Sequence, residues 1–282
     1  MEIRTCLKTI EEILRAGGIE EAACEARLIL GQRLDCQPGR LFLREGGVDR
    51  AAWEAALRLA RRRAARQQLQ YLLGVQQFMG LDFLVNEKTP IPRWDTEPMT
   101  EQAISLMRAY DAPLIADLCC GGGAIAVSMA KALPKARLIA ADICPEALQV
   151  ARQNAQKHEV GERIEFLRGD LLEPLRGREG GLDMLVCNPP YILSEEIDAL
   201  SPEVRKEPRL ALDGGEDGLR FYRLLAAGAA PFLREEGWLI LEIGDGQKEE
   251  VCRLLRESGW LVEKVTRDLA GRERAVFVRK PM

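Results

Sequence analysis

The chain has 282 residues, a formal net charge of −4 and a hydrophobic fraction of 47%. This length is enough for one large domain and one small one, and the apolar fraction is ordinary for a packed core. No apolar run approaches the roughly 18 residues that a membrane span requires, and the acidic balance does not suit a protein that covers a phosphate backbone. The composition therefore excludes a membrane protein and argues against broad contact with nucleic acid.

The N-terminus and the cysteines indicate the compartment. The first residues carry charges and have no apolar core of the signal-peptide type, so we expect a cytoplasmic protein. The eight cysteines are scattered and form no C-x-x-C pair, which is typical of reduced thiols that pack as small hydrophobic groups. The single histidine, His158, lies in a polar stretch after a predicted helix, so we expect neither a catalytic histidine nor a metal site.

Residues 1–70 have the pattern of a small helical domain. Apolar residues recur at helical spacing within residues 7–14, 23–30 and 53–59, and glycine or proline pairs interrupt the pattern between these stretches. A group of five arginines falls at the end of the third stretch, and we expect a solvated helix face or else a contact for an acidic protein. These residues are Arg58, Arg61, Arg62, Arg63 and Arg66.

Residues 71–85 have a different pattern, β-rich and punctuated by glycine, which predicts a hairpin in a linker, residues 71–92, between the helical domain and the rest of the chain. Two prolines then stiffen the approach to Asp95 and Thr96, either of which could cap a helix that runs to about residue 110. Over residues 93–282 predicted strands and helices alternate. This alternation is typical of an α/β domain with a parallel sheet.

A glycine-rich turn lies between the first strand of this domain, residues 114–118, and a predicted helix over 124–132. Such a turn lets the backbone approach a ligand closely, and the helix N-terminus adds oriented N–H groups. Two further strands are predicted over 136–141 and 164–167. Because parallel strands present their carboxyl ends at one edge, we expect the residues that follow them to converge on an adenosine. They are Cys119, Cys120, Gly121, Gly122 and Gly123 in the turn, Asp142 for the ribose hydroxyls, and Asp170 with Leu171 for the adenine ring.

The tetrapeptide Asn188-Pro189-Pro190-Tyr191 closes a short apolar run at residues 184–187 and predicts the reacting site. A planar amide or amino nitrogen is a poor nucleophile, so its N–H groups need fixed acceptors that aim its lone pair at an electrophilic methyl. The Asn188 side-chain oxygen and the Pro189 carbonyl can be those acceptors, since proline has no competing N–H. Tyr191 offers an aromatic face against which a flat group can stack.

The glycine-rich turn and the tetrapeptide are more informative together than apart. A lone glycine-rich turn would serve a dinucleotide-dependent dehydrogenase as readily, and the tetrapeptide alone also fits an ordinary proline turn at the end of a strand. A dehydrogenase has no use for Asn-Pro-Pro-Tyr after its fourth strand. The combination therefore points to a methyltransferase that uses S-adenosylmethionine.

Four blocks of the sequence are informative together. They are residues 70–81, 91–97, 188–192 and 207–219, with 267–272 as a further match. In these blocks, and over nearly the whole chain, the sequence resembles the release-factor glutamine methyltransferase family. The tetrapeptide is shared with adenine-specific DNA methyltransferases, whereas the second and fourth blocks are far more specific to this family.

The resemblance implies a Rossmann-like class I methyltransferase domain over residues 93–282, after a small helical domain over 1–70 and a hairpin linker over 71–92. The implied reaction transfers a methyl group from S-adenosylmethionine to the glutamine amide nitrogen in the Gly-Gly-Gln motif of class I peptide chain release factors, which act in translation termination. S-adenosylhomocysteine is the product, and the helical domain engages the release factor. The implied substrate residues are Asn188, Pro189, Pro190, Tyr191 and Arg93, and Asn188 also borders the cofactor.

Two positions depart from the family pattern. Cys119 stands where the first glycine of the turn is usual, and Trp94 stands where a proline usually follows the arginine. Cysteine is small enough to sit at a strand end, so we expect Cys119 to change the backbone conformation of the turn more than it changes cofactor binding. We expect Trp94 to change the rim of the site.

Three other functions share part of this evidence. A glutamine methyltransferase acting on a ribosomal protein would use the same tetrapeptide, and the helical domain argues against it. An adenine-N6 methyltransferase of nucleic acid would stack a flipped base on Tyr191, but it should carry a basic recognition region that this acidic chain lacks. A release-factor binder without catalysis would not need an intact Asn188 and Tyr191. We expect a monomer that contacts neither nucleic acid nor membrane directly.

Overall fold

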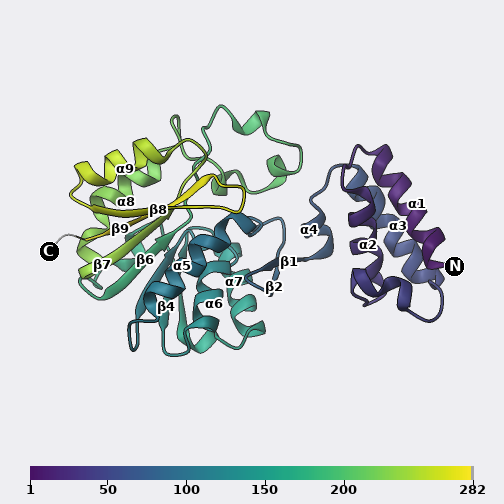
Figure 1. Cartoon of the computed structure of the whole chain (residues 1–282), viewed down its shortest axis with the longest axis horizontal. Helices are drawn as coiled ribbons and strands as arrows, with labels where there is room; N and C mark the ends of the chain where they lie inside the picture. Colours follow the sequence, from purple (N-terminus) through teal and green to yellow (C-terminus); the bar gives the residue numbers. More distant parts are fainter. Residues whose placement is uncertain (281–282) are drawn as a thin grey trace. The chain divides into compact units, whose positions relative to one another are not determined.

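The computed structural model describes residues 1–280, which form two compact units (Figure 1). One, the helical unit, consists of Met1–Val75 and of Ser201–Lys206 from a distant part of the chain. The other, the sheet unit, consists of residues 76–200 and the described residues from 207 onward. Compactness alone does not assign roles, so the functional division at residues 70 and 92 stays a prediction.

The helical unit is built from helices that bury apolar side chains. They are α1 (Ile3–Ala16), α2 (Ala22–Arg33), α3 (Arg50–Ala64) and the short α4 (Leu69–Leu73). Ile10, Leu14 and Ile29 are fully buried among them, as expected for apolar residues at helical spacing. The predicted β pattern from residue 71 is wrong at its start, because residues 71–73 belong to α4 and the first strand begins at Val75.

Arg63 is the centre of a buried ion-pair group in the helical unit. Its Nε lies 2.7 Å from Oε2 of Glu25, and its Nη1 lies 2.8 Å from Oε1 of Glu203, which belongs to the segment Ser201–Lys206. Arg66 also pairs with Glu203, at 2.7 Å. A buried guanidinium needs such partners, because an unpaired buried charge is costly. The solvated face predicted for the arginines is correct only for those that are exposed, Arg58, Arg61 and Arg62.

A seven-stranded sheet forms the centre of the sheet unit, with strand order β5-β4-β3-β6-β7-β9-β8. Strands β5 to β7 in this order run parallel, and β9 is antiparallel to both of its neighbours. The strands are β3 (Leu114–Leu118), β4 (Arg137–Asp142), β5 (Ile164–Arg168), β6 (Leu182–Cys187), β7 (Leu233–Glu242), β8 (Leu261–Arg267) and β9 (Glu273–Arg279). A two-stranded hairpin consists of β1 (Val75–Phe78) and β2 (Leu81–Leu84).

Helices cover both faces of the seven-stranded sheet (Figure 1). Successive residues of a strand point to opposite faces, so Ile115 packs in the first layer and Ala116 in the second. Because both faces are buried, the central strands read as continuous apolar runs. The first layer contains α5 (Glu97–Met107), α6 (Ala124–Ala132) and α7 (Pro145–Lys157), and the second contains α8 (Arg220–Gly228) and α9 (Lys248–Glu257).

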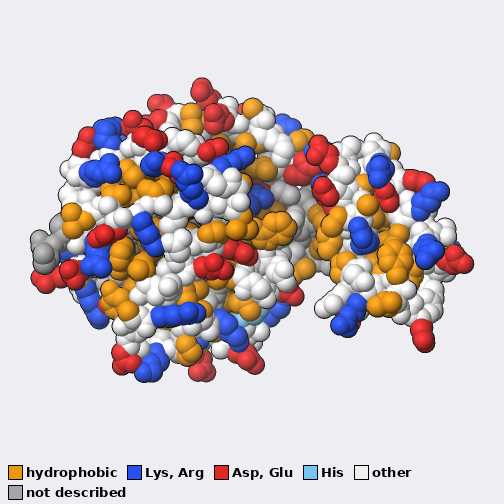
Figure 2. Space-filling view, in the orientation of Figure 1, with side chains coloured by type: hydrophobic (Ala, Val, Ile, Leu, Met, Phe, Trp, Pro, Cys, Tyr) orange, Lys and Arg blue, Asp and Glu red, His pale blue; other side chains and the backbone are white. Residues whose placement is uncertain are grey.

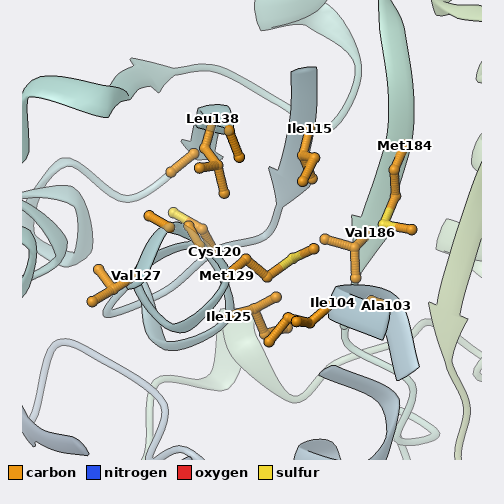
Figure 3. Close-up of a cluster of buried hydrophobic side chains, with 14 of the residues drawn as sticks. Ala103, Ile104, Ile115, Cys120, Ile125, Val127, Met129, Leu138, Met184 and Val186 are labelled. Carbon is orange, nitrogen blue, oxygen red and sulfur yellow. The ribbon is translucent and has the colours of Figure 1, made fainter. Parts of the chain in front are cut away.

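Figure 3 shows the core of the first layer. Met129 of α6 extends toward Val186 of β6, and Ile104 of α5 belongs to the same cluster. All three side chains are buried, which fixes α6 against the sheet. The start of α6 is therefore held firmly beside the end of β3. Among residues 1–280, no helix is long and apolar enough to cross a membrane.

Candidate active site

The register of the sheet brings the ends of four strands to one level. Leu118 of β3 pairs with Ala141 of β4 and with Cys187 of β6, and Cys187 pairs with Leu241 of β7. The chain order reverses between β3 and β6, and open α/β sheets bind ligands at such a switch point. The residues one position further along these strands are Asp142, Cys119, Asn188 and Glu242.

The turn after β3 places left-handed backbone at alternate residues. The φ angle is 55° at Cys119, 52° at Gly121 and 79° at Gly123. A Cβ on Gly121 would lie 2.9 Å from Cγ of Pro90, and a Cβ on Gly123 would lie 3.0 Å from Cβ of Ala151. Glycine is therefore required at these two positions both by the backbone angle and by the packing of the protein itself.

We expect the substitution Gly123→Ala to lower the free energy of unfolding by about 3 kcal/mol, since it adds a strained φ to an overpacked contact with α7. The matched control is Gly177→Ala, because Gly177 has a φ of 81° but nothing within 4 Å of a built Cβ. The control should lose only about 1 kcal/mol, the cost of the backbone angle. Urea denaturation of both variants measures the difference, and equal losses would show that the contact with Ala151 is not tight.

A buried carboxyl group, Asp117, and a half-buried one, Asp142, hold this turn in place. Asp142 accepts hydrogen bonds from the N–H of Gly121 at 2.8 Å and from the N–H of Cys144 at 2.9 Å. Asp117 in β3 accepts one from the N–H of Ala126 at 3.0 Å and so ties the strand to α6. Burial raises the pKa of Asp142, an effect that the N–H donors partly offset. Burial also raises the pKa of Asp117 to about 8, so this carboxyl group is mostly protonated at pH 7.

The residues at these strand ends fit a nucleoside that carries an anionic group. No side chain caps the start of α6 at Gly123, and the N–H groups of a first helical turn attract negative charge. Asp142 stands at the next strand end, where a carboxylate can accept from ribose hydroxyls. The N–H of Gly169 donates to the Asp142 carbonyl at 3.2 Å, which places the segment after β5 beside it. This segment presents Asp170, which is exposed, and Leu171, which is buried.

Asn188 and Tyr191 share a hydrogen-bond network with two residues from elsewhere in the chain. Nδ2 of Asn188 donates to Oγ1 of Thr96 at 3.3 Å, and the Thr96 hydroxyl donates to Oε2 of Glu242 at 2.6 Å. The Tyr191 hydroxyl donates to Oε1 of the same carboxylate at 3.5 Å. Thr96 and Glu242 are buried, whereas Asn188 and Tyr191 are half-buried. Burial and the charge of Glu242 raise the pKa of Tyr191, so its hydroxyl keeps its proton.

The loop after the tetrapeptide packs directly on Tyr191. The N–H of Ile192 donates to the Leu212 carbonyl at 3.0 Å, and the N–H of Gly214 donates to the Ile192 carbonyl at 2.8 Å. A Cβ on Gly214 would lie 2.7 Å from Cα of Tyr191, so only glycine permits this approach. Nε2 of Gln247 donates to the Tyr191 carbonyl at 3.0 Å. The glycine block that follows the tetrapeptide thus supports the tetrapeptide itself.

Arg93 lies on a segment that the same loop holds. Its Nη2 forms an ion pair with Oε1 of Glu207, and the N–H of Ile91 donates to Oε2 of Glu207 at 3.2 Å. Arg93 is exposed and the Glu207 side chain is buried, so this carboxylate anchors the guanidinium at the surface. Both prolines of the tetrapeptide, Pro189 and Pro190, are buried. A substrate role for Arg93 stays a prediction.

Two family models match the chain, the PrmC N-terminal domain at residues 5–74 and the methyltransferase small domain at residues 100–207. A release factor glutamine methyltransferase of Geobacter sulfurreducens is 41% identical over 88% of this chain and 86% of its own length. Another, from Moorella thermoacetica, is 45% identical over 276 residues, which is 97% of each chain. The chain belongs to the release factor glutamine methyltransferases.

Solved structures share the fold of this methyltransferase. A methyltransferase from Pyrococcus furiosus aligns with a TM-score of 0.53 at 17% identity, over 73% of this chain and 91% of that one. The likeness concerns the fold alone. With the strand order and the helices on both faces, it confirms the predicted α/β methyltransferase domain and the preceding helical region.

The two departures from the family pattern have different structural consequences in this methyltransferase. Cys119 takes up the left-handed backbone that a glycine would adopt there, with φ at 55°, which costs a residue with a Cβ roughly 1–2 kcal/mol. The backbone of the turn therefore keeps its left-handed conformation at Cys119, and this lowers the free energy of unfolding. Trp94 begins the short 3₁₀ helix η2 (Trp94–Thr96) and is 66% exposed, so the change affects the surface and not the core.

Sequence reasoning missed two residues of this site, Thr96 and Glu242. It predicts Asp95 or Thr96 as a helix cap, but no side chain caps α5, and the Thr96 hydroxyl bonds to Glu242 instead. One signal was present in the sequence. Glu242 directly follows the apolar run 238–241 of β7, and a carboxyl group in a buried strand needs hydrogen-bond partners.

Proposed function

We propose that this methyltransferase transfers a methyl group from S-adenosylmethionine to the side-chain amide nitrogen of the glutamine in the Gly-Gly-Gln motif of class I peptide chain release factors. The observation that supports it most is the half-buried Asn188, whose Nδ2 is bonded inward to Thr96, so that its oxygen is left to accept from a substrate. Relatives that match nearly the whole chain carry the name of this reaction.

The tetrapeptide supplies what an amide nucleophile needs. The Asn188 oxygen and the Pro189 carbonyl would each accept one N–H of the glutamine amide, which fixes the plane of the amide and the direction of its lone pair. Tyr191 would pack against the flat amide, and its protonated hydroxyl adds no charge. S-adenosylmethionine supplies an electrophilic methyl group when it is bound. No general base has to act first, because the amide nitrogen becomes acidic once it is methylated.

The cofactor would be held at the ends of β3, β4 and β5. The turn from Cys119 to Gly123 would accommodate its amino-acid part against the start of α6, and Asp142 would accept from the ribose hydroxyls. Asp170 and Leu171 would contact the adenine edge and face. The neutral Asp117 behind the turn adds no negative charge to that of Asp142.

The proposal also covers the partner, the compartment and the oligomeric state. The helical domain would engage the release factor away from its methylated loop, and the enzyme would act as a cytoplasmic monomer. Figure 2 shows Lys and Arg interspersed with Asp and Glu over the visible face. With 40 basic and 44 acidic residues in the chain, such a surface does not favour a nucleic acid as the partner. This weighs against the adenine-methylating alternative.

A methyl-transfer assay tests the proposal directly. Purified release factor and labelled S-adenosylmethionine are incubated with the enzyme, beside a release factor whose Gly-Gly-Gln glutamine is replaced. We expect label on the natural factor only, and mass spectrometry of its tryptic peptide should place the methyl group on that glutamine. No transfer by an enzyme that binds the cofactor would overturn the proposed substrate.

A further inference from the structure

A directed chain of hydrogen bonds runs inward from the tetrapeptide. It starts at Nδ2 of Asn188, passes through the hydroxyl of Thr96 and ends at Oε2 of Glu242. Thr96 is 4% exposed and Glu242 is 1% exposed, so water does not compete with these bonds. The three residues come from different parts of the fold, since Thr96 precedes α5, Asn188 follows β6 and Glu242 ends β7.

The donor-to-acceptor direction of these hydrogen bonds depends on the protonation state of Glu242. An ionised carboxylate can only accept, so the single proton of the Thr96 hydroxyl must point at Glu242. The Thr96 oxygen can then only accept from Asn188, which means that the NH₂ end of the Asn188 amide faces inward. We propose that Thr96 and Glu242 are positioning residues that fix the Asn188 amide with its oxygen toward the substrate. This inference rests on the proposed function of Asn188 as an acceptor.

Protonation of Glu242 would remove the fixed donor-to-acceptor direction of these hydrogen bonds. A carboxyl group that carries a proton can donate to Thr96, whose own proton is then free to point at Asn188 and to favour the flipped amide. The flipped amide would present NH₂ to the N–H groups of the substrate, which is a repulsive arrangement. The oxygen would face the substrate most of the time only when Glu242 is ionised.

The groups around Glu242 place the pKa of its carboxyl group near neutral pH. Burial raises its pKa to about 7, while the Thr96 hydroxyl and the Arg274 guanidinium act in the opposite sense. Asp95 raises it further and the Tyr191 hydroxyl lowers it. Arg274 is itself shared, since its Nη2 lies 3.0 Å from Oδ2 of Asp268 and 3.6 Å from Oδ2 of Asp95. These groups leave Glu242 protonated below about pH 7 and ionised above it.

Variants of Thr96 test the positioning role. Thr96→Val keeps the shape but removes the hydroxyl, and we expect kcat to fall about tenfold with little change in the dissociation constant of the cofactor. Thr96→Ser should recover most of the loss. Thr100→Val is the matched control, because Thr100 is a buried threonine in α5, the helix that Thr96 precedes, and its hydroxyl bonds to the Thr96 carbonyl and not to Glu242. Full activity of Thr96→Val, or an equal loss in the control, would overturn the inference.

The pH dependence separates positioning from a general structural role. In the natural enzyme kcat should rise with pH through about 7, as Glu242 loses its proton. Glu242→Gln cannot titrate, so its kcat should lack this step. The same step should appear in the natural protein, without any methyl transfer, as a pH-dependent shift of the Asn188 side-chain ¹⁵N–H₂ signals, assigned by their loss in Asn188→Ala. Identical profiles for the natural protein and Glu242→Gln, or signals that do not titrate, would refute the role of Glu242 whatever the substrate is.

Discussion

Replacing Asn188 by alanine should lower kcat for methyl transfer about a hundredfold or more, as loss of a preorganised polar group does in other enzymes. In the proposed mechanism the side chain would accept from the substrate when the nitrogen is aligned for attack, so its loss should act on the transition state more than on binding. The dissociation constant of S-adenosylmethionine should change far less. Single-turnover assays give the first quantity, and calorimetry with the cofactor gives the second.

Asn86→Ala is a suitable control for this variant. Asn86 is an exposed asparagine in the loop after β2, and its side chain accepts from the N–H of Lys88. Its replacement should leave both quantities near those of the natural enzyme. If Asn188→Ala weakened cofactor binding as strongly as it slowed transfer, Asn188 would be a cofactor residue and the acceptor role would be wrong.

Replacing Asp142 by alanine should have the opposite pattern, with cofactor affinity weakened about tenfold to a hundredfold and kcat at saturating cofactor changed less. Hydrogen bonds to a charged group contribute roughly 1.5–3 kcal/mol each, and here the carboxylate also holds the N–H of Gly121 in the turn. The raised pKa of Asp142 adds a pH effect. As the pH falls, this group takes up a proton sooner than an ordinary aspartate does, and affinity should decline with it.

Glu146→Ala serves as the control for Asp142, since Glu146 is an exposed acid in the first turn of α7. Calorimetric titration with S-adenosylmethionine at several pH values measures both variants. Unchanged affinity in Asp142→Ala would mean that the ribose lies elsewhere. Equal losses of affinity in the Asn188 and Asp142 variants would contradict the separate roles given to the two residues.

The sequence was sufficient to predict the framework around the candidate site, which depends on local pattern. Strand, glycine turn and helix around Gly121 are neighbours along the chain, and the helix predicted over 124–132 has the same bounds as α6. The acid after the second strand and the tetrapeptide after the fourth follow from one rule, that parallel strands end at one edge. Sheet register then aligns Asp142 with Asn188 without further information.

The interactions that the sequence did not reveal are those that join distant segments. Thr96 and Glu242 are 146 residues apart in the chain, and so are not linked by any periodicity. Glu203 lies in a loop without a regular pattern, and nothing local indicates that it pairs with Arg63 across 140 residues. The structure differs from the prediction at residues 71–73 for another reason, because a helix as short as α4 does not produce an apolar period.

Because Ser201–Lys206 belongs to the helical unit, the chain cannot be cut into its two units at a single position. The chain passes between the two units at three places instead of one, after Val75, after Leu200 and after Lys206. A fragment that starts after residue 75 would retain Glu203 but lose both of its arginine partners. The N-terminal region is therefore not an independent module that can be removed or exchanged at a single junction, and chimeras between relatives would have to exchange the loop segment together with the helices.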